Sequence, residues 1–261
     1  MTISDIDWFE WNGVKCTVSQ YGMHVLSQPS IVSPLERSEQ VSIPGKSGTL
    51  TLLEGDDIYD NIALSCSCVI DDINKLSAIT RWLKGSGTVK FPMRPDGFYK
   101  ARIANQISFE KAVQGNPHRL FSVQFQCEPF FYYDSGKVAT RYTSSPVNLT
   151  NAGNIHSLPL IKVEGSGSAG RIMSGFSTMF FDFDGDNPNG TPSTSLSYII
   201  IDCEAKIAYT GDGTGNDPFV LRGTRVTGDW MNIPEGLNNQ SFLTFGDGVT
   251  AVTITPRWRS I

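Results

Sequence analysis

The sequence predicts an all-β protein with a single helix, and three observations carry this prediction. Apolar and polar residues alternate over many short segments, which is typical of strands that bury one face. The 261 residues include 25 glycines and 14 prolines, so turns are frequent. Only one segment has the apolar spacing of an amphipathic helix. Hydrophobic residues make up 39% of the chain and charged residues 18%, which is the composition of a folded globular protein.

Two segments of the first half show the alternation most clearly. Residues 64–70 place Leu64, Cys66, Cys68 and Ile70 on one face, and the odd-numbered residues of 121–127 are apolar. We expect two half-buried strands there. The Cys66/Cys68 pair is interpreted as small apolar residues, because a second ligand pair at zinc-site spacing is missing. Five cysteines in a long chain also favour free thiols over a disulfide framework.

The predicted helix follows the first of these strands. Asp71 or Asp72 can cap its N-terminus, and Gly85 supplies a left-handed stop. Its apolar stripe consists of Ile73, Leu76, Ile79 and Leu83, with Trp82 beside it.

A hairpin is expected directly after the helix. Residues 88–93 and 98–104 are strand-like, and Arg94-Pro95-Asp96-Gly97 between them has the residues of a tight turn. We therefore predict the turn at 94–97.

Two features of the first fifty residues point to contact with another subunit. Gly45 and Gly48 flank a short β-like run, which can form an exposed arm or edge that pairs with a neighbour. Trp8, Phe9 and Trp11 form an aromatic cluster, which is either a core or an interface anchor. An exposed apolar patch there would favour subunit contact.

The alternation ends near residue 133, and residues 134–146 have the texture of a connector. We expect a first domain at 1–133, a linker at 134–146 and a second domain at 147–261. Gly, Asn and Asp clusters separate short strands in the second domain at the spacing of a β-sandwich. These expected strands are 158–164, 176–183, 196–203, 219–222, 241–245 and 249–255.

The net charge restricts the classes of partner that the chain is expected to bind. The chain has 21 basic and 26 acidic residues, and its net charge of −5 argues against wrapping nucleic acid or an anionic membrane. Its first residues have neither a basic nor a long apolar stretch, so we expect no export signal. No apolar run approaches the roughly 18 residues of a membrane span. We expect assembly in the cytosol and no membrane partner.

Two glycine-containing motifs resemble nucleotide sites. Gly165-Ser166-Gly167-Ser168-Ala169-Gly170 matches the dinucleotide fingerprint, which requires a helix to follow and receive the pyrophosphate. The segment that follows, 171–176, is short and is closed by a glycine, so it does not provide that helix. The glycine-containing string is interpreted as a loop. Pro44-Gly45-Lys46-Ser47 ends like a phosphate loop, yet Gln40 stands where the first glycine is required. No cofactor is predicted.

Metal and catalytic candidates are weak. The loop 182–190 offers three carboxylates and two side-chain amides to calcium, but its glycine spacing and Ser193 at the twelfth position do not fit, so a polar turn is favoured. His24, His118 and His156 lack a nucleophile motif. The acidic residues of 54–60 crowd one solvated loop. We predict no metal ligand, no catalytic residue and no enzyme activity.

An ordered series of segments in this sequence resembles the distal tail (Dit) protein family of long-tailed bacteriophages (siphoviruses) or prophages. The similarity covers roughly residues 1–133 and is supported by shorter strings in the second half. The segments are Tyr21–Val25, Ile43–Thr51, Trp82–Gly87, Phe98–Ile103 with Asn105, Phe125–Tyr132, Asn151–Asn154, Ser157–Pro159 and Pro256–Arg259.

The resemblance implies a structural virion protein with two β-rich domains. Its N-terminal domain would be β-sandwich-like and close into a hexameric ring, and its C-terminal domain would be a galectin-like β-sandwich. Such a ring is a hub that joins the tail tube to the baseplate or tail tip, contacts tail-associated, tip or receptor-binding proteins, and lets DNA pass without specific binding. The location implied is the phage tail, assembled in the host cytoplasm.

Two departures qualify what the resemblance implies. Lys46 stands where the family usually has arginine after Pro-Gly, so a bidentate contact there is lost. The second half also lacks the His-x-Asn-x-Arg string of sugar-binding galectins, so a docking module is favoured. The alternative function is a carbohydrate-binding module of the tail tip, with Trp230 as a stacking residue.

Overall fold

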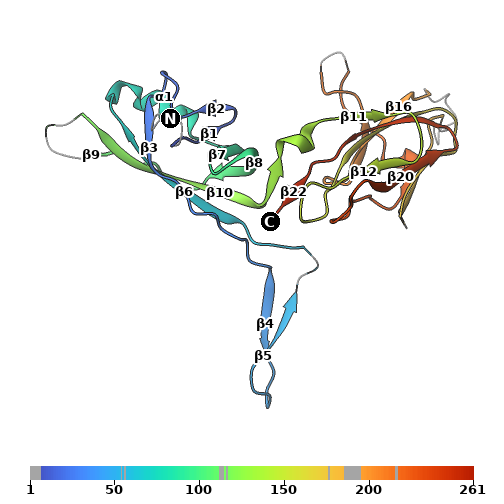
Figure 1. The fold of residues 1–261 in the computed structure, drawn as a ribbon, viewed down its shortest axis with the longest axis horizontal. Helices are drawn as coiled ribbons and strands as arrows, with labels where there is room; N and C mark the ends of the chain where they lie inside the picture. Colours follow the sequence, from blue (N-terminus) through green and yellow to red (C-terminus); the bar gives the residue numbers. More distant parts are fainter. Residues whose placement is uncertain are drawn as a thin grey trace. The chain divides into compact units, whose positions relative to one another are not determined.

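The computed structural model describes residues 7–53, 55, 57–111, 115, 117–175, 177–184, 195–214 and 217–261. The chain forms two compact units (Figure 1). Unit 1 comprises Met1–Tyr132 with Ile261, and unit 2 comprises Tyr133–Ser260. Strands dominate both units, and α1 (Leu76–Trp82) is the α-helix of the described residues. The predicted all-β fold with one helix is confirmed.

The main sheet of unit 1 is antiparallel and has the strand order β2-β1-β7-β8-β10-β6-β3, with β9 paired to β10. A separate ribbon pairs β4 with β5. The strands are β1 (Glu10–Trp11), β2 (Val14–Lys15), β3 (Met23–Ser27), β4 (Ser38–Ser42), β5 (Thr49–Leu53), β6 (Ile62–Ile70), β7 (Ser86–Phe91), β8 (Arg94–Ile103), β9 (Glu110–Lys111) and β10 (Arg119–Tyr133).

The core of unit 1 lies on one face of this sheet. Strand β6 pairs with β10 from Ile62 opposite Cys127 to Ile70 opposite Arg119. Every second residue of β6 is buried, and the odd-numbered residues of β10 from Phe121 to Cys127 are buried as well. Both half-buried strands are therefore confirmed. Alternation predicts them well because each strand buries only one face.

The aromatic cluster near the N-terminus belongs to this core. Phe9 and Trp11 are fully buried, and the Phe9 ring stacks on Trp82 of α1 at 5.7 Å. Trp82 also stacks on Tyr21 at 4.2 Å. Of the two alternatives for this cluster, the structure favours the core for Phe9 and Trp11, because these rings fill the space between the helix and the sheet.

The helix begins later than its apolar stripe suggests. Asp72 caps a 3₁₀ turn, η2 (Ile73–Lys75), by accepting a 2.9 Å hydrogen bond from the Asn74 N–H, and α1 follows this turn. The left-handed Gly85 (φ 76°) lies past the helix end as predicted. Ile73 is 46% exposed, whereas Ile79 is buried. The tighter 3₁₀ turn takes Ile73 off the buried face of the α-helix.

The hairpin of β7 and β8 is present, but its turn is not at 94–97. Phe91 pairs with Arg94, so the turn lies at residues 92–93 and Arg94–Gly97 are already part of β8. A Cβ atom at Gly97 would lie 2.2 Å from the Tyr132 carbonyl oxygen and 2.6 Å from the Phe131 ring. Gly97 is therefore required by close packing and not by a turn, which explains why the turn prediction was wrong.

All five cysteines are free and buried. Burial raises the pKa of Cys66, Cys127 and Cys203 to about 12 and raises the pKa of Cys16 and Cys68 as well. The thiolate is the reactive form of cysteine. We therefore expect a disulfide reagent such as DTNB to label less than one thiol per folded chain and all five in guanidinium. Rapid labelling of the folded protein would contradict this packing.

Unit 2 contains two antiparallel sheets with the orders β11-β21-β13-β16-β17-β18 and β12-β20-β14-β15-β19. The expected linker 134–146 opens this unit with η3 (Asp134–Lys137) and β11. The strands are β11 (Thr140–Tyr142), β12 (Val147–Leu149), β13 (Leu160–Gly165), β14 (Gly170–Ser174), β15 (Ser177–Phe181), β16 (Tyr198–Asp202), β17 (Ile207–Thr210), β18 (Val220–Leu221), β19 (Val226–Gly228), β20 (Gln240–Gly246), β21 (Val249–Thr255) and β22 (Arg259–Ser260), and a second 3₁₀ turn is η4 (Gly223–Arg225).

The two sheets of unit 2 share one apolar core. Ile161 and Ile254 come from one sheet, Ile172, Phe181 and Leu243 come from the other, and all five are buried in one cluster. Each of the six strands predicted for this region overlaps an observed strand. Strands of two to five residues were missed, among them β14 and β17, because so few residues show little alternation. Within the described residues no helix has the length and apolar character needed to cross a membrane.

Candidate functional site

The ribbon of β4 and β5 exposes several large apolar side chains to solvent. We call residues 38–53 the arm. Figure 1 shows it extending away from the sheet of unit 1. Of twenty large apolar side chains that are exposed among the described residues, eight lie between residues 26 and 53. The apolar surface that needs a partner is therefore concentrated at the arm and its approach.

The arm has two chemically different faces. Its register pairs Glu39 with Leu52 and Val41 with Leu50, so these four side chains share one face because side chains alternate across a strand. Leu50 is 42% exposed and Leu52 is 45% exposed. We call these four residues the apolar face. Glu39 is its only charged member.

The opposite face of the arm is mainly polar. Gln40 Nε2 donates to Thr51 Oγ1 at 3.2 Å, and Gln40 also accepts a hydrogen bond from Thr49. These cross-strand bonds stabilise the ribbon without using the apolar face. Leu50 and Leu52 remain available to pack against another surface.

Local interactions fix the tip and the base of the arm. At the tip, Gly45 (φ 83°) and Gly48 (φ 84°) adopt left-handed conformations that favour glycine. At the base, Arg37 Nε lies 3.1 Å from Asp60 Oδ1, and the Asp60 N–H donates to the Leu35 carbonyl at 2.9 Å. An exposed arm at these two glycines was predicted from the sequence, and the structure contains it. The amphipathic register was missed, although Val41, Leu50 and Leu52 alternate with polar residues.

A groove of about 560 Å³ lies on the solvent-facing side of β7, β8 and β10 in unit 1, and we call it groove A. Asn61, at the end of the arm's return to the sheet, is one of its lining residues. Phe98 and Ala101 contribute apolar surface, and Lys100, Arg102 and Glu128 contribute charge.

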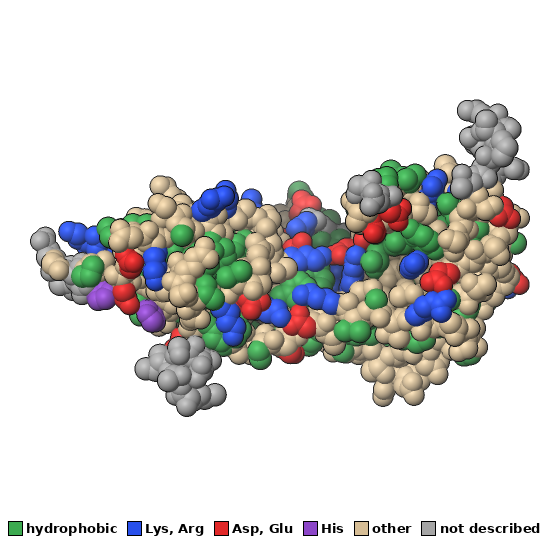
Figure 2. Space-filling view, turned by 90° about the horizontal axis from the view of Figure 1, so that it is seen from above, with side chains coloured by type: hydrophobic (Ala, Val, Ile, Leu, Met, Phe, Trp, Pro, Cys, Tyr) green, Lys and Arg blue, Asp and Glu red, His purple; other side chains and the backbone are tan. Residues whose placement is uncertain are grey.

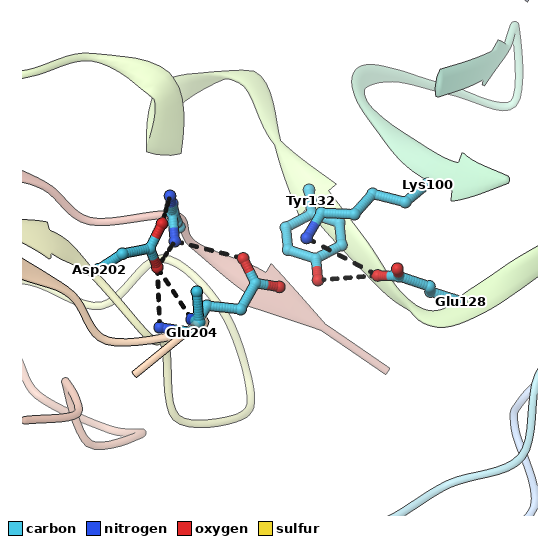
Figure 3. Close-up of polar contacts among 7 residues, drawn as sticks. Lys100, Glu128, Tyr132, Asp202 and Glu204 are labelled. Atoms are coloured by element: carbon cyan, nitrogen blue, oxygen red, sulfur yellow. Dashed lines mark hydrogen bonds and ion pairs between the residues drawn. The ribbon is translucent and has the colours of Figure 1, made fainter. Parts of the chain in front are cut away.

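The charged side chains of groove A are held in place across the two strands. Lys100 Nζ lies 3.7 Å from Glu128 Oε2 and 4.4 Å from the centre of the Tyr132 ring (Figure 3). The Tyr132 hydroxyl donates to the same carboxylate at 3.2 Å. Arg102 Nε donates to Gln126 Oε1 at 2.7 Å, and both residues line the groove. Groove A thus presents two cations and one carboxylate around an apolar floor.

A second groove, groove B, lies nearer the start of β10. Its volume is about 340 Å³, and Leu26, Leu120 and Phe121 contribute its apolar surface. Glu110 is the one charged residue among its described lining residues. The two grooves of unit 1 therefore differ in the sign of their charge.

The residues that sequence inspection singled out for chemistry are dispersed. His24 Nε2 and His118 Nδ1 contact the two oxygens of Asp71 at 3.3 and 2.7 Å on the surface of unit 1. His156 lies in unit 2, where its carbonyl accepts a hydrogen bond from Arg259. In the part of the chain that the structure describes, no three His, Cys, Asp or Glu side chains form a group that can hold a metal ion. Residues 185–190 of the calcium-like loop lie outside the described residues.

The fingerprint-like glycines of 165–170 have a packing role. Gly165 ends β13 and Gly170 begins β14, so the string joins two strands instead of leading into a helix. A Cβ atom at Gly165 or Gly170 would lie 2.7 or 2.6 Å from the ring of Phe183, which is fully buried. The interpretation as a loop is confirmed.

Trp230 does not offer a free ring to a sugar. Its side chain is half-buried and packs against the apolar core of unit 2. A carbohydrate site centred on this residue therefore lacks the exposed flat surface that stacking requires.

Unit 2 contains a charged anchor that the sequence did not reveal. Arg257, at φ 55°, donates from two nitrogens to the two oxygens of Asp202 at 2.8 and 2.9 Å, and one of them also contacts Glu204 at 3.2 Å (Figure 3). Burial alone would raise the pKa of Asp202, but hydrogen bonds from Arg257 and from the Glu204 and Ala205 N–H groups outweigh it and lower the pKa below its usual value of 3.8.

This anchor makes stability depend on pH. Because folding lowers the pKa of Asp202, its contribution to stability is fully present above pH 3.8 and is lost as the pH falls through the lower folded value. We expect Asp202→Asn to melt below wild type at pH 7 and the difference to shrink below pH 4. Glu110→Gln, at an exposed site in unit 1, is the control. A pH-independent difference would contradict the ion pair as its cause.

Buried hydrogen bonds hold the start of unit 2. The Asn151 side chain is almost fully buried, and its amide group lies 3.1 Å from the Ile155 carbonyl and 3.0 Å from the Pro234 carbonyl. Its side-chain oxygen accepts the Gly153 N–H at 2.9 Å. A Cβ atom at Gly153 would lie 1.8 Å from the Arg259 carbonyl oxygen. The segments 151–154 and 256–259, which carried the resemblance in the second half, thus have structural roles.

Comparisons with known proteins found similarity in solved structures. No family model matches the sequence, and the comparison with curated proteins gave no match. The crystal structure of the Dit protein (gp 19.1) of phage SPP1, described as a paradigm of the hub adsorption apparatus of phages that infect Gram-positive bacteria, aligns with a TM-score of 0.68 and 12% identity. The alignment covers 95% of this chain and 98% of that chain.

A chain of the phage p2 baseplate, in its activated conformation with Sr, aligns over 95% of this chain and 97% of that chain with 6% identity and a TM-score of 0.41. That score is too low to indicate a shared fold. The SPP1 alignment spans both units, and the resemblance stated from the sequence is confirmed at the level of the fold. The chain therefore has the fold of the SPP1 Dit protein over nearly its whole length.

Proposed function

We propose that this protein is a structural subunit of a phage tail. Unit 1 closes with five further copies into a hexameric ring that links the tail tube to the baseplate or tail tip. The protein is assembled in the host cytoplasm and remains in the virion. The fold shared with SPP1 Dit supports this role, and the apolar face of the arm is the observation that carries it.

The arm supports ring formation for a physical reason. An isolated two-stranded ribbon is marginally stable in water, and one that exposes two leucines on a single face gains stability when a partner covers them. Figure 1 shows the ribbon directed away from its own sheet. A surface that binds a different patch of the next copy gives head-to-tail contacts, which close into a ring when the rotation fits.

Unit 2 is proposed to dock other tail proteins. Strand β18 is at the end of its sheet, and the exposed fractions of Phe219, Val220 and Leu221 are 63%, 41% and 73%. An edge strand with exposed apolar side chains is a template for strand addition by a baseplate or receptor-binding protein. This role needs no reacting group, in agreement with a protein that is not an enzyme.

The acidic balance suits a conduit for DNA. A ring with few fixed cations on its wall releases few counterions and does not hold the duplex as it passes. The net charge is −5, and in Figure 2 basic and acidic side chains are interspersed on the visible face. Tight, salt-dependent binding of duplex DNA by the purified protein would contradict passage without specific binding.

The ring is tested by mass and by imaging. Six copies of 28.6 kDa give about 172 kDa, which light scattering distinguishes from a monomer. We expect this mass at micromolar concentration and six-fold annuli in negative-stain electron micrographs. Monomers at every concentration, alone and with neighbouring tail proteins, would overturn the proposal, and so would turnover of a substrate.

A further inference from the structure

We propose that groove A is the surface that receives the arm of the neighbouring copy. This inference rests on the proposed ring and names the acceptor within it. A head-to-tail ring needs two different complementary patches on the same chain. The apolar face of the arm is one patch, and the second must offer apolar contact together with a charge that matches the arm.

The apolar requirement is met at groove A. Leu50 and Leu52 lie on one face of a two-stranded ribbon. Groove A is an open trough on three strands of a sheet, with Phe98 and Ala101 among its lining residues. Two aliphatic side chains that leave water there contribute in proportion to the area they bury.

Charge decides between the two grooves of unit 1. The apolar face of the arm includes one carboxylate, Glu39, next to Leu52 in the register. Groove A contains Arg102 and the Lys100–Glu128 pair, so Glu39 entering it meets a net positive charge. Glu110 is the one charged residue among the described lining residues of groove B, so the Glu39 carboxylate would meet a like charge there. Like charges brought together at an interface are costly, and complementary ones fix the register.

The tip of the arm adds a second match. Lys46 lies in the turn between β4 and β5, and groove A contains the exposed carboxylate of Glu128. The arm therefore carries one anion on its face and one cation at its tip, and groove A carries both opposite charges. Asn61, which follows Asp60 at the base of the arm, also lines groove A, so both patches belong to unit 1.

Disulfide trapping tests this contact directly. The native thiols are all buried, so engineered cysteines react selectively. We expect Leu52→Cys with Gln126→Cys to form disulfide-linked dimers and higher multimers on mild oxidation. The matched control is Leu52→Cys with Ser122→Cys, which places the second thiol at groove B on the same strand and face. Four residues of strand separate the two positions by roughly 13 Å, whereas a disulfide spans Cα atoms about 6 Å apart.

A charge swap provides a second readout that does not depend on cysteine chemistry. Glu39→Arg and Arg102→Glu are each expected to weaken ring assembly by about tenfold or more, and the double variant should restore it. The acid-for-base exchange leaves the buried cores untouched, since both side chains are exposed. The melting temperature of each single variant should equal that of the wild-type chain in its unassembled state.

The outcomes separate this inference from the proposed function. A ring that forms in the wild type, with cross-links at Ser122 or none at Gln126, overturns groove A as the acceptor and leaves the ring intact. Failure of the double charge variant to restore assembly also counts against groove A. A wild-type chain that never forms a ring overturns the proposed function and this inference together.

Discussion

Leu50→Asp with Leu52→Asp is expected to convert the ring into monomers. Both side chains lie on the apolar face of the arm and are exposed in the single chain. Burying each leucine at the contact contributes about 2 kcal/mol, so losing both weakens one contact by roughly a thousandfold. Two carboxylates that must leave water add a further cost. Light scattering should show the mass of one chain at concentrations where wild type shows six.

The matched control changes the other face of the same strand. Thr49→Asp with Thr51→Asp adds the same two charges at positions that share the polar face with Gln40. This variant should still assemble. Leu50→Thr with Leu52→Thr, which introduces β-branched residues that favour a strand but removes the apolar surface, should be monomeric like the aspartate variant. Equal loss in the control would mean that charge on the arm, and not its apolar face, governs assembly.

Both aspartate variants must remain folded for this comparison to be valid. Their cysteines should stay unreactive, because the thiols are buried and the arm forms a sheet separate from the main sheet of unit 1. Assembly of the Leu50→Asp/Leu52→Asp variant at wild-type concentration would show that another surface closes the ring.

Sequence patterns predicted the elements whose causes are local. The strands β6 and β10 were found because one face of each is buried, so polarity alternates along the chain. Asp72 and Gly85 mark the limits of the helical segment through their own backbone chemistry. Gly45 and Gly48 likewise marked the turn of the arm.

The features that the sequence did not reveal depend on residues far apart in the chain. Gly97 suggested a turn, but it is glycine because Tyr132 approaches it closely. Arg257 binds Asp202 across 55 positions, and no spacing rule connects them. Groove A forms only when β8 lies beside β10, which brings Lys100 next to Glu128. Local sequence patterns therefore identified the strands and the arm. The close packing at Gly97, the Arg257–Asp202 ion pair and groove A depend on tertiary packing.

Asn151→Ala is expected to destabilise unit 2 by about 3 kcal/mol, which lowers its melting temperature by roughly 10 °C. The side chain is 8% exposed and bonds the carbonyls of Ile155 and Pro234 and the Gly153 N–H. Alanine leaves those three backbone groups without the amide that satisfies them. An unsatisfied buried group costs about 1 to 3 kcal/mol, whereas the asparagine side chain itself contributes little apolar burial.

Asn148→Ala separates this effect from a general intolerance of the segment. Asn148 lies three residues earlier on β12 and is exposed, so its replacement should change stability by less than about 0.5 kcal/mol. Asn151→Asp is the sharper test, because it keeps the size but replaces the donating amide with an oxygen that faces the Ile155 and Pro234 carbonyls. It should destabilise at least as much as alanine at pH 7. A wild-type melting temperature for Asn151→Asp would show that shape, and not donation to these carbonyls, fixes this residue.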